Sequence, residues 1–425
     1  MLDLPYPPLK LNIGFISTRF AGTDGVSLET EKWAEVLEES GHHCFYFSGE
    51  SDRPKSVSMI IPQAHYRHPE IEARHQHFFG KEQRAIEDTS WIHEKTAFFK
   101  QKLYEFKDRF NVEVLIPENC LAIPLHVPLG LAITEFIAET QLPTIAHHHD
   151  FSWERKRFLV NNVWDYLSMA FPPTLHAIQH VTINSSGRHQ LARRKGVVST
   201  IIPNVMHFEK PAPGIDAYNL DLRKVLGISE EQLFVLQPTR VVQRKGIEHA
   251  IELLARLKMD AVLVISHASG DEGHEYELRL REYAQMMNVR TIFAADTFDE
   301  KRGTTPDGKK VYSLWDAYPH ADLVTYPSLI EGFGNAFLEA VYFKKPIVVN
   351  NYTIYNIDIR TKGFQVIEFD DFITDETVEA TRRVLTSPGE VTRMTAHNYG
   401  LALKYYSYQV LKSKLEALID NLVWI

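Results

Sequence analysis

Short apolar runs alternate with longer amphipathic segments along almost the whole chain. Residues 11–17 (LNIGFIS), 112–116 and 233–237 are compact hydrophobic runs bounded by polar residues, a pattern typical of strands buried on both faces of a parallel sheet. Residues 26–40 and 91–110 instead carry apolar side chains at helical spacing. This alternation predicts an α/β protein with parallel sheets.

The same reading extends over the rest of the chain. Further strands are expected at residues 42–48, 143–146, 180–184, 200–202, 261–265, 290–295, 323–326 and 347–349. Further helices are expected at 123–139, 153–170, 185–194, from Gly246 onward, and at 275–288, 335–343 and 401–422. Residues 53–88 are interpreted as a variable insertion or helical excursion, and residues 296–310 as an exposed loop.

The length of 425 residues suits two domains of about 200 residues each. Proline, glycine and aspartate between Lys210 and Asp221 indicate a linker. We therefore expect an N-terminal domain over residues 1–210 and a C-terminal domain over residues 211–404.

Composition adds limits to this picture. Hydrophobic residues make up 44% and charged residues 24%, ordinary values for a soluble globular protein, and the net charge of −9 argues against nucleic acid as a partner. No segment approaches about 18 uninterrupted apolar residues, so no membrane span is expected, although peripheral membrane contact stays open. Cys44 and Cys120 are expected to be buried thiols. With no signal-peptide pattern at the N-terminus, we expect a cytoplasmic monomer or small homo-oligomer.

Candidate chemistry concentrates in residues 326–350, where a strand, a glycine-containing loop, a helix and a second strand follow one another. Gly332 and Gly334 stand at the start of the helix, where free backbone N–H groups favour an anion. Glu331 and Glu339 suit a ligand that carries hydroxyls beside its phosphates, such as a sugar nucleotide. The alternative is that both are ordinary solvated carboxylates.

Two cations follow the strand at 233–237. Arg240 and Lys245 stand at its carboxyl end, where they would neutralise the charge that grows on a departing diphosphate. A solvated basic turn before a helix is the alternative. In the first half, Gly22 and Gly25 lie between a strand and a helix and would admit an anion or a tight turn. They do not form Gly-x-Gly-x-x-Gly, so a nicotinamide or flavin cofactor is not supported.

Three histidines and an aspartate, residues 147–150, come at the carboxyl end of the strand at 143–146. A metal cluster is one interpretation. Consecutive positions point in different directions, which disfavours a metal and leaves structural histidines or a proton-carrying histidine near a substrate.

The glutamate block matches a known signature. The matching positions are Ser328, Glu331, Gly332, Phe333, Gly334 and Glu339. The block resembles the donor site of retaining glycosyltransferases of the GT-B fold, in the glycogen synthase and sucrose-phosphate synthase-like family (glycosyl transferases group 1, family 4). The resemblance implies two facing Rossmann-like domains with a deep interdomain cleft, and a terminal helix, about residues 405–425, that packs back on the N-terminal domain. The chain departs from the family at Lys344 and Lys345, where glycine is common before the closing proline.

The resemblance also implies a role for each candidate. The diphosphate would contact Arg240, Lys245, Gly25 and the backbone N–H groups of Gly332, Phe333, Gly334 and Asn335, while Glu339 would bind the ribose and Glu331 the donor sugar. The His-x-Asp spacing selects His148 and Asp150 as residues near the reacting carbon. No cofactor and no metal is expected, and the implied substrates are a UDP-glucose or GDP-mannose type donor and a small glycoside or glycan acceptor.

Residues 22–33 and 147–155 resemble a subgroup that includes mannosylglucosylglycerate synthases, and the basic stretch Arg155–Arg157 would suit an acidic acceptor. Two other functions stay open on the same architecture. One is a sugar-nucleotide epimerase or, less well matched in length, a phosphorylase. The other is a non-catalytic sugar-nucleotide-binding protein.

Overall fold

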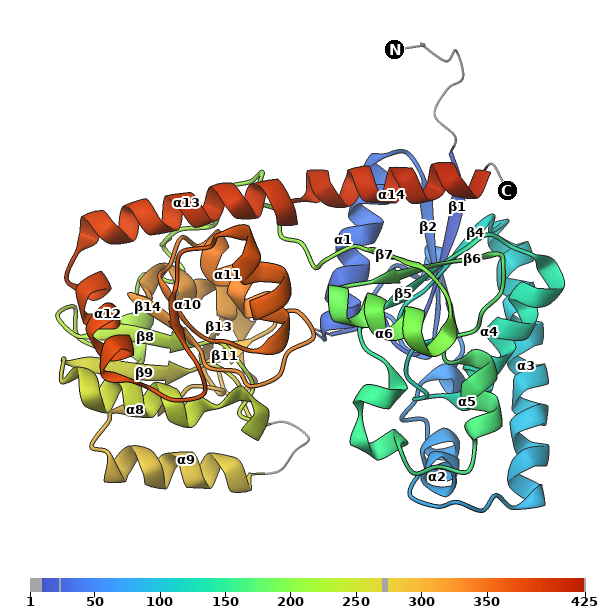
Figure 1. Cartoon of the computed structure of the whole chain (residues 1–425), viewed down its shortest axis with the longest axis horizontal. Helices are drawn as coiled ribbons and strands as arrows, with labels where there is room; N and C mark the ends of the chain where they lie inside the picture. Colours follow the sequence, from blue (N-terminus) through green and yellow to red (C-terminus); the bar gives the residue numbers. More distant parts are fainter. Residues whose placement is uncertain (1–9, 23, 270–273, 424–425) are drawn as a thin grey trace, which may run out of the picture. The chain divides into compact units, whose positions relative to one another are not determined.

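The chain divides into two compact units. The computed structural model describes residues 10–22, 24–269 and 274–423. Unit 1 comprises Met1–Asn204 together with Tyr408–Ile425, and unit 2 comprises Val205–Ser407. Each unit is organised around a parallel sheet flanked by helices, as Figure 1 shows for each of them.

Unit 1 contains a seven-stranded sheet in the order β3-β2-β1-β4-β5-β6-β7, with every neighbouring pair parallel. Its strands are β1 (Asn12–Ile16), β2 (His43–Ser48), β3 (Ser58–Ile60), β4 (Val114–Pro117), β5 (Thr144–His148), β6 (Ile178–Thr182) and β7 (Ser199–Ile201). Its helices are α1 (Gly25–Glu39), α2 (Pro69–Phe78), α3 (Ile86–Phe110), α4 (Val127–Thr140), α5 (Trp164–Ala170), α6 (Ser185–Lys195) and α14 (Tyr408–Val423).

The core of unit 1 follows from the apolar runs. Phe99 and Phe106 of α3 and Phe136 of α4 pack with strand residues such as Phe47 and Leu115 in one buried cluster. In Figure 1, α3 and α4 lie side by side along one flank of the sheet, and α14 packs against α1. Burial of this kind is the dominant favourable term in folding, so the predicted strands and helices form where the sequence places them.

Unit 2 contains a six-stranded parallel sheet in the order β10-β9-β8-β14-β15-β16. Its strands are β8 (Leu233–Gln237), β9 (Ala261–Ile265), β10 (Thr291–Phe293), β14 (Leu323–Tyr326), β15 (Ile347–Asn350) and β16 (Ile367–Phe369). Its helices are α7 (Leu222–Val225), α8 (Ile247–Leu257), α9 (Glu275–Met286), α10 (Leu314–Ala317), α11 (Asn335–Tyr342), α12 (Asp375–Leu385) and α13 (Pro388–Tyr406). Because β14 pairs directly with β8, the loops that leave these two strands start at the same edge of the sheet.

The expected helix at 153–170 is wrong over its first half. Two short 3₁₀ turns, Ser152–Glu154 and Lys156–Phe158, precede α5. The backbone at 160–162 forms hydrogen bonds with another segment of the chain. Asn161 forms an antiparallel bridge with Phe79, and the Val160 carbonyl accepts a hydrogen bond from the Gly80 N–H. A continuous helix would need those same backbone groups.

Two further expectations change. The helix expected at 401–422 is broken at Ser407, which is extended (φ −86°, ψ 167°), so that α13 ends in unit 2 and α14 begins in unit 1. The segment 296–310, expected as a loop, contributes to a small sheet of β11 (Phe298–Asp299), β12 (Gly303–Thr304) and β13 (Lys310–Ser313). Across the described residues, no helix is both long and apolar enough to cross a membrane.

Candidate functional site

The carboxyl edge of the unit 2 sheet gathers the two strongest sequence candidates. Lys245 ends the short turn Gln243–Lys245 after β8, and Glu331 lies in the loop after β14. The Lys245 ammonium donates a hydrogen bond to Glu331 Oε1, and Arg244 Nη1 lies 3.4 Å from Glu331 Oε2. The side chains of Lys245 and Glu331 are only 11% and 10% exposed, so the pair is largely removed from water.

Backbone contacts tie the two loops together. The Leu329 N–H donates to the Arg244 carbonyl at 2.9 Å, and Arg244 Nη1 donates to the Ile330 carbonyl at 3.3 Å. Since the loops leave adjacent parallel strands, these hydrogen bonds fix the position of Lys245 relative to Glu331. The sequence predicted both residues as ligands of one substrate but did not predict their direct contact.

Burial and charge set the ionisation of this cluster. Burial acts to raise the pKa of Glu331, but the charges of Lys245 and Arg244 outweigh it, so the pKa is lowered and the carboxylate is ionised. The pKa of Lys245 is lowered by burial and by the neighbouring arginines, with Glu331 opposing. Tyr326 beneath them has its pKa raised well above the usual range by burial and by the Glu331 charge.

Arg240 and His267 complete the positive edge. Arg240 is exposed, and its charge lowers the pKa of both Lys245 and His267, which places all three within electrostatic reach. Burial, aided by Arg240 and Lys245, lowers the pKa of His267 to about 4, so the imidazole is neutral at physiological pH. His267 was not among the predicted residues. Its signal was its place just after the apolar run 261–265, which becomes β9 beside β8.

The start of α11 is the segment whose glycines led to the prediction of backbone donors for an anion. Gly334 is the residue before the helix, with φ 126° and ψ 66°, and Asn335 is its first helical residue. The Phe333 side chain is buried against Tyr406, with ring centroids 5.4 Å apart, so only its backbone is available to a ligand. Its carbonyl accepts a 2.8 Å hydrogen bond from Tyr352, while Gly332 is exposed.

Glu339 lies one turn further along α11 and is half-buried. Its carboxylate Oε2 accepts a 2.7 Å hydrogen bond from the Tyr318 hydroxyl. This hydrogen bond restricts the orientation of the carboxylate.

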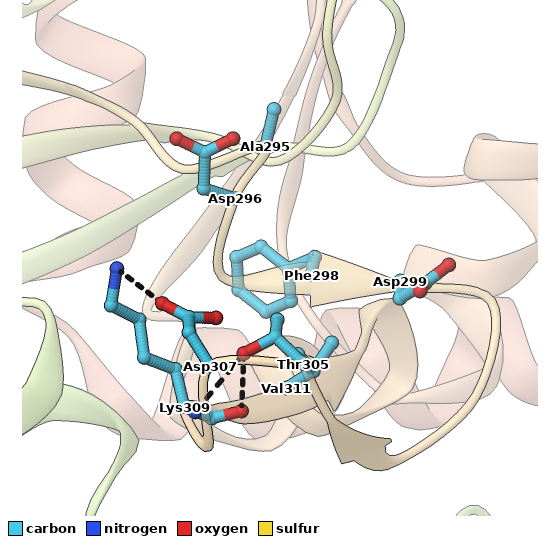
Figure 2. Close-up of a pocket in the computed structure, with 8 residues that line it drawn as sticks. All are labelled: Ala295, Asp296, Phe298, Asp299, Thr305, Asp307, Lys309 and Val311. Atoms are coloured by element: carbon cyan, nitrogen blue, oxygen red, sulfur yellow. Dashed lines mark hydrogen bonds and ion pairs between the residues drawn. The ribbon is translucent and has the colours of Figure 1, made fainter.

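A cavity of ≈ 380 Å³ lies beside the small sheet of unit 2 and does not suit a diphosphate. Figure 2 shows its lining, in which the Lys309 ammonium reaches the Asp307 carboxylate. Asp296 and Asp299 add two further carboxylates. One ammonium against three carboxylates leaves the lining negative, whereas the Lys245 edge is positive.

In unit 1, Gly25 begins α1 and is exposed, but the helix start already has an anion. Asp24 Oδ1 accepts from the Val26 N–H at 3.1 Å and the Ser27 N–H at 3.2 Å, and Arg19 lies 2.8 Å from Asp24 Oδ2. The aspartate takes the position that a phosphate at Gly25 would need. Sequence reasoning considered only the glycines and missed this cap.

Strand β5 extends to His148, two residues beyond its expected end at residue 146. The first two histidines therefore belong to the strand and not to the turn that follows it. His148 is 1% exposed, its Nε2 lies 2.9 Å from His180 Nδ1, and its pKa is lowered well below the usual range by burial and by the neighbouring histidines. Asp150 is partly buried; it accepts a 2.9 Å hydrogen bond from Asn119 Nδ2 and forms an ion pair with Arg155.

His147 and His149 point to the opposite side from His148 and meet Glu118. His147 Nδ1 lies 2.9 Å from Glu118 Oε2, and His149 Nε2 lies 3.6 Å from the same oxygen. Burial lowers the pKa of His147 to about 3 and raises that of Glu118 to about 7. The expectation that consecutive histidines point in different directions is confirmed, and His147 and His149, two positions apart, lie on the same side.

Each of the two units is built on a parallel sheet flanked by helices, and this is the GT-B fold of the solved glycosyltransferase structures that the chain resembles. The model of the family "Glycosyl transferases group 1" matches residues 219–400. Mannosylglucosylglycerate synthase of Thermotoga maritima is 30% identical over 95% of this chain and 99% of its own, and that of Petrotoga mobilis is 33% identical over 84% and 86%. The structure of Anabaena Alr3699/HepE in complex with UDP and glucose aligns with a TM-score of 0.64 at 13% identity, covering 96% of this chain and 99% of its own.

The chain therefore belongs to the glycosyl transferases group 1 family, and it is a glycosyltransferase.

Proposed function

We propose that the protein transfers a hexosyl group, with retention of configuration, from a nucleotide-diphosphate sugar to a hydroxyl of a small acidic glycoside. The observation that carries the proposal is the cationic edge of unit 2, where Lys245 and Arg244 contact Glu331 beside Arg240. The complex of HepE with UDP and glucose supports a nucleotide-sugar donor, and the two synthases named above support an acidic glycoside as acceptor.

Charge balance explains why a diphosphate suits this edge. Three cations, Arg240, Arg244 and Lys245, and one carboxylate, Glu331, leave two positive charges. The diphosphate of a sugar nucleotide carries two negative charges. We propose that these side chains, with the backbone N–H groups at the start of α11, hold the diphosphate without a metal and without a cofactor.

The reaction breaks the bond between the anomeric carbon of the donor and the phosphate oxygen. Negative charge grows on that oxygen, and fixed cations in a site with little water stabilise it more in the transition state than in the bound donor. In the proposed front-face mechanism the acceptor hydroxyl forms the new bond, and its proton passes to the departing phosphate oxygen. Glu331 would bind the donor sugar, and Glu339 the ribose.

We place the acceptor side on unit 1, in the segment that follows β5. Asp150 and Arg155 pair there, and Lys156 and Arg157 are exposed beside them. These cations suit the carboxylate of an acidic glycoside. His148 would act by positioning this turn, because its ring packs against Phe151 with centroids 5.3 Å apart and its side chain is not exposed.

The test begins with a thermal-shift and calorimetric screen of UDP, GDP and ADP sugars, followed by transfer to glucosylglycerate and to a neutral glucoside. We expect Lys245→Met to lower turnover by about 100-fold or more, as loss of one electrostatic donor does elsewhere. Lys309→Met, an exposed lysine of the same unit, is the matched control and should match the wild type. Product anomers read by NMR report retention or inversion.

Glu331→Gln separates the roles of the glutamate. It removes the negative charge beside Lys245, so free nucleoside diphosphate should bind more tightly while hexosyl transfer falls. Absence of any sugar-nucleotide binding, or wild-type turnover in Lys245→Met, would overturn the proposal.

A further inference from the structure

A cluster of metal-ligand side chains belongs to unit 1, whereas the residues proposed to hold the donor's phosphates belong to unit 2. Glu118, His147 and His149 each offer one ligand atom, and these atoms all lie within 4.8 Å of one another. Over residues 10–22, 24–269 and 274–423, no second group of three such side chains meets this condition.

Strand register brings the three residues together. Glu118 follows β4 directly and forms a parallel bridge with His147 of β5, which sets the two side chains next to each other. His149, two positions after His147, returns to the same side, and the two imidazole rings lie 4.4 Å apart. The ligands therefore arrive from two neighbouring strand ends and face a common point.

The cluster also contains buried polar atoms without hydrogen bonds. Glu118 Oε1, His147 Nε2 and His149 Nε2 are buried, and none has a partner within hydrogen-bond distance among the described residues. The side chains of Glu118 and His147 are 0% and 1% exposed. Leaving such atoms unpaired is costly, and an ion held by Glu118 and His149 would satisfy Glu118 Oε1 and His149 Nε2.

We propose that Glu118, His147 and His149 bind a divalent transition-metal ion of the Zn²⁺ class. Two imidazoles and one carboxylate are the protein ligands of open zinc sites, and imidazole favours this class over Mg²⁺ or Ca²⁺. Ligand atoms at about 2.0–2.2 Å from a tetrahedral ion stand about 3.3–3.6 Å apart. The separations of 2.9 Å and 3.6 Å from Glu118 Oε2 already bracket that range.

The surroundings hold the ligands as a metal site requires. Asn119 Oδ1 accepts a 3.0 Å hydrogen bond from the His149 N–H, and the Asn119 N–H donates to the His147 carbonyl at 2.8 Å. Trp33 of α1 stacks on the His147 ring, with centroids 4.2 Å apart and planes 20° from parallel. A fixed ring orientation and an apolar neighbour that excludes water are features that residues around a metal site provide to its ligands.

Of the three side chains, that of His149 is the most exposed, at 10%, against 1% for His147 and 0% for Glu118, so a further ligand would reach a bound ion from the His149 side. An oxygen ligand, from water or from a carboxylate or hydroxyl of a substrate, would complete the site. Bound metal would fix the ends of β4 and β5 to each other and so hold the turn that carries Asp150. This inference stands on unit 1 alone and does not depend on the donor chemistry of unit 2.

The test is direct metal binding by the untagged full-length protein. After treatment with a chelator and its removal, the protein is titrated with Zn²⁺ by calorimetry, and the bound metal is counted by mass spectrometry of the elements. Co²⁺ serves as a spectroscopic probe, because four-coordinate Co²⁺ gives strong visible absorption. We expect one ion per chain with a tetrahedral Co²⁺ spectrum.

Variants assign the site. Glu118→Gln and His149→Gln should each weaken Zn²⁺ binding by about 100-fold or more, since even partners outside the ligand set are worth about 10–100-fold. His189→Gln changes an exposed histidine of α6 and is the matched control, which should bind as the wild type does. Circular dichroism and binding of the sugar nucleotide to unit 2 show that each variant is folded.

A stoichiometric ion lost in both ligand variants and kept in the control supports the site. If the wild type binds no Zn²⁺, water satisfies the cluster and the inference is wrong. Binding that survives both ligand variants, or that His189→Gln abolishes, would equally overturn it.

Discussion

Replacing Gly334 with alanine should destabilise unit 2 and distort the start of α11. The residue has φ 126°, a conformation that L side chains rarely adopt, which costs about 1–3 kcal/mol. An added Cβ would lie 2.5 Å from the Tyr352 hydroxyl and 3.3 Å from that of Tyr326. Moving Tyr352 away gives up its 2.8 Å hydrogen bond to the Phe333 carbonyl, worth about 1 kcal/mol. Together these effects should lower the free energy of unfolding by about 2–4 kcal/mol.

A glycine of α13 gives a control with the opposite sign. Gly400 lies inside that helix, is exposed, and has no atom within 4 Å of the position of an added Cβ. Gly400→Ala should therefore raise the free energy of unfolding by about 0.5–1 kcal/mol through helix propensity.

Urea unfolding gives the two free energies, and hydrogen exchange over residues 323–343 shows whether the loss is centred on β14 and α11. Sugar-nucleotide affinity should fall in Gly334→Ala and stay unchanged in Gly400→Ala. The reasoning is refuted if Gly334→Ala unfolds at the wild-type urea concentration, or if both substitutions shift stability in the same direction.

Three further substitutions test the packing of the site and of unit 1. Lys245→Met leaves the buried Glu331 carboxylate with Arg244 as its remaining ion-pair partner, so the free energy of unfolding should fall by about 3 kcal/mol. The double variant with Glu331→Gln should recover at least half of this loss, and an equal loss in the single and double variants would contradict the reasoning. Burial lowers the pKa of His126 from 6.5 to about 4, so protonation of this histidine opposes folding. The free energy of unfolding should therefore fall by about 3 kcal/mol as the pH falls from 6.5 to 4. Urea titrations of His126→Gln should show a flatter pH profile, and an unchanged slope would count against this assignment. Gly49→Ala would place a Cβ 2.0 Å from a backbone nitrogen, so unit 1 should lose about 3 kcal/mol in thermal or urea unfolding, and wild-type stability would show that the contact is not tight.

The sequence predicted the sheets better than the segments between them. Residues 233–237 and 261–265 are strands at the expected positions, because a strand buried on both faces must be an apolar run with polar ends. The region 153–162 was misread as helix, since its structure is set by a pairing with residues 79–80 that lie far away in the chain. Local propensity carries no information on such a partner.

The candidate site was predictable as a set of residue types but not as a set of contacts. Glu331 and Lys245 were both singled out, yet their ion pair depends on β14 lying beside β8, although β9 to β13 separate the two strands in the sequence. Arg244 was overlooked because it stands next to Lys245, and only the loop after β14 turns it toward Glu331. Which of several basic residues faces a ligand is decided by strand order, not by spacing.

Strand parity decides the chemistry of residues 147–150. Had β5 ended at residue 146, as the apolar run suggested, the histidines would have left the sheet in unrelated directions. The strand instead continues to His148, so the alternation of side chains persists: His148 turns to His180 on one side, and His147 and His149 turn to Glu118 on the other. A shift by one residue would exchange these partners and place a single histidine beside the carboxylate. The two additional strand residues therefore decide whether these histidines form an irregular loop or a cluster with Glu118. The register with β4 shows that the cluster is formed.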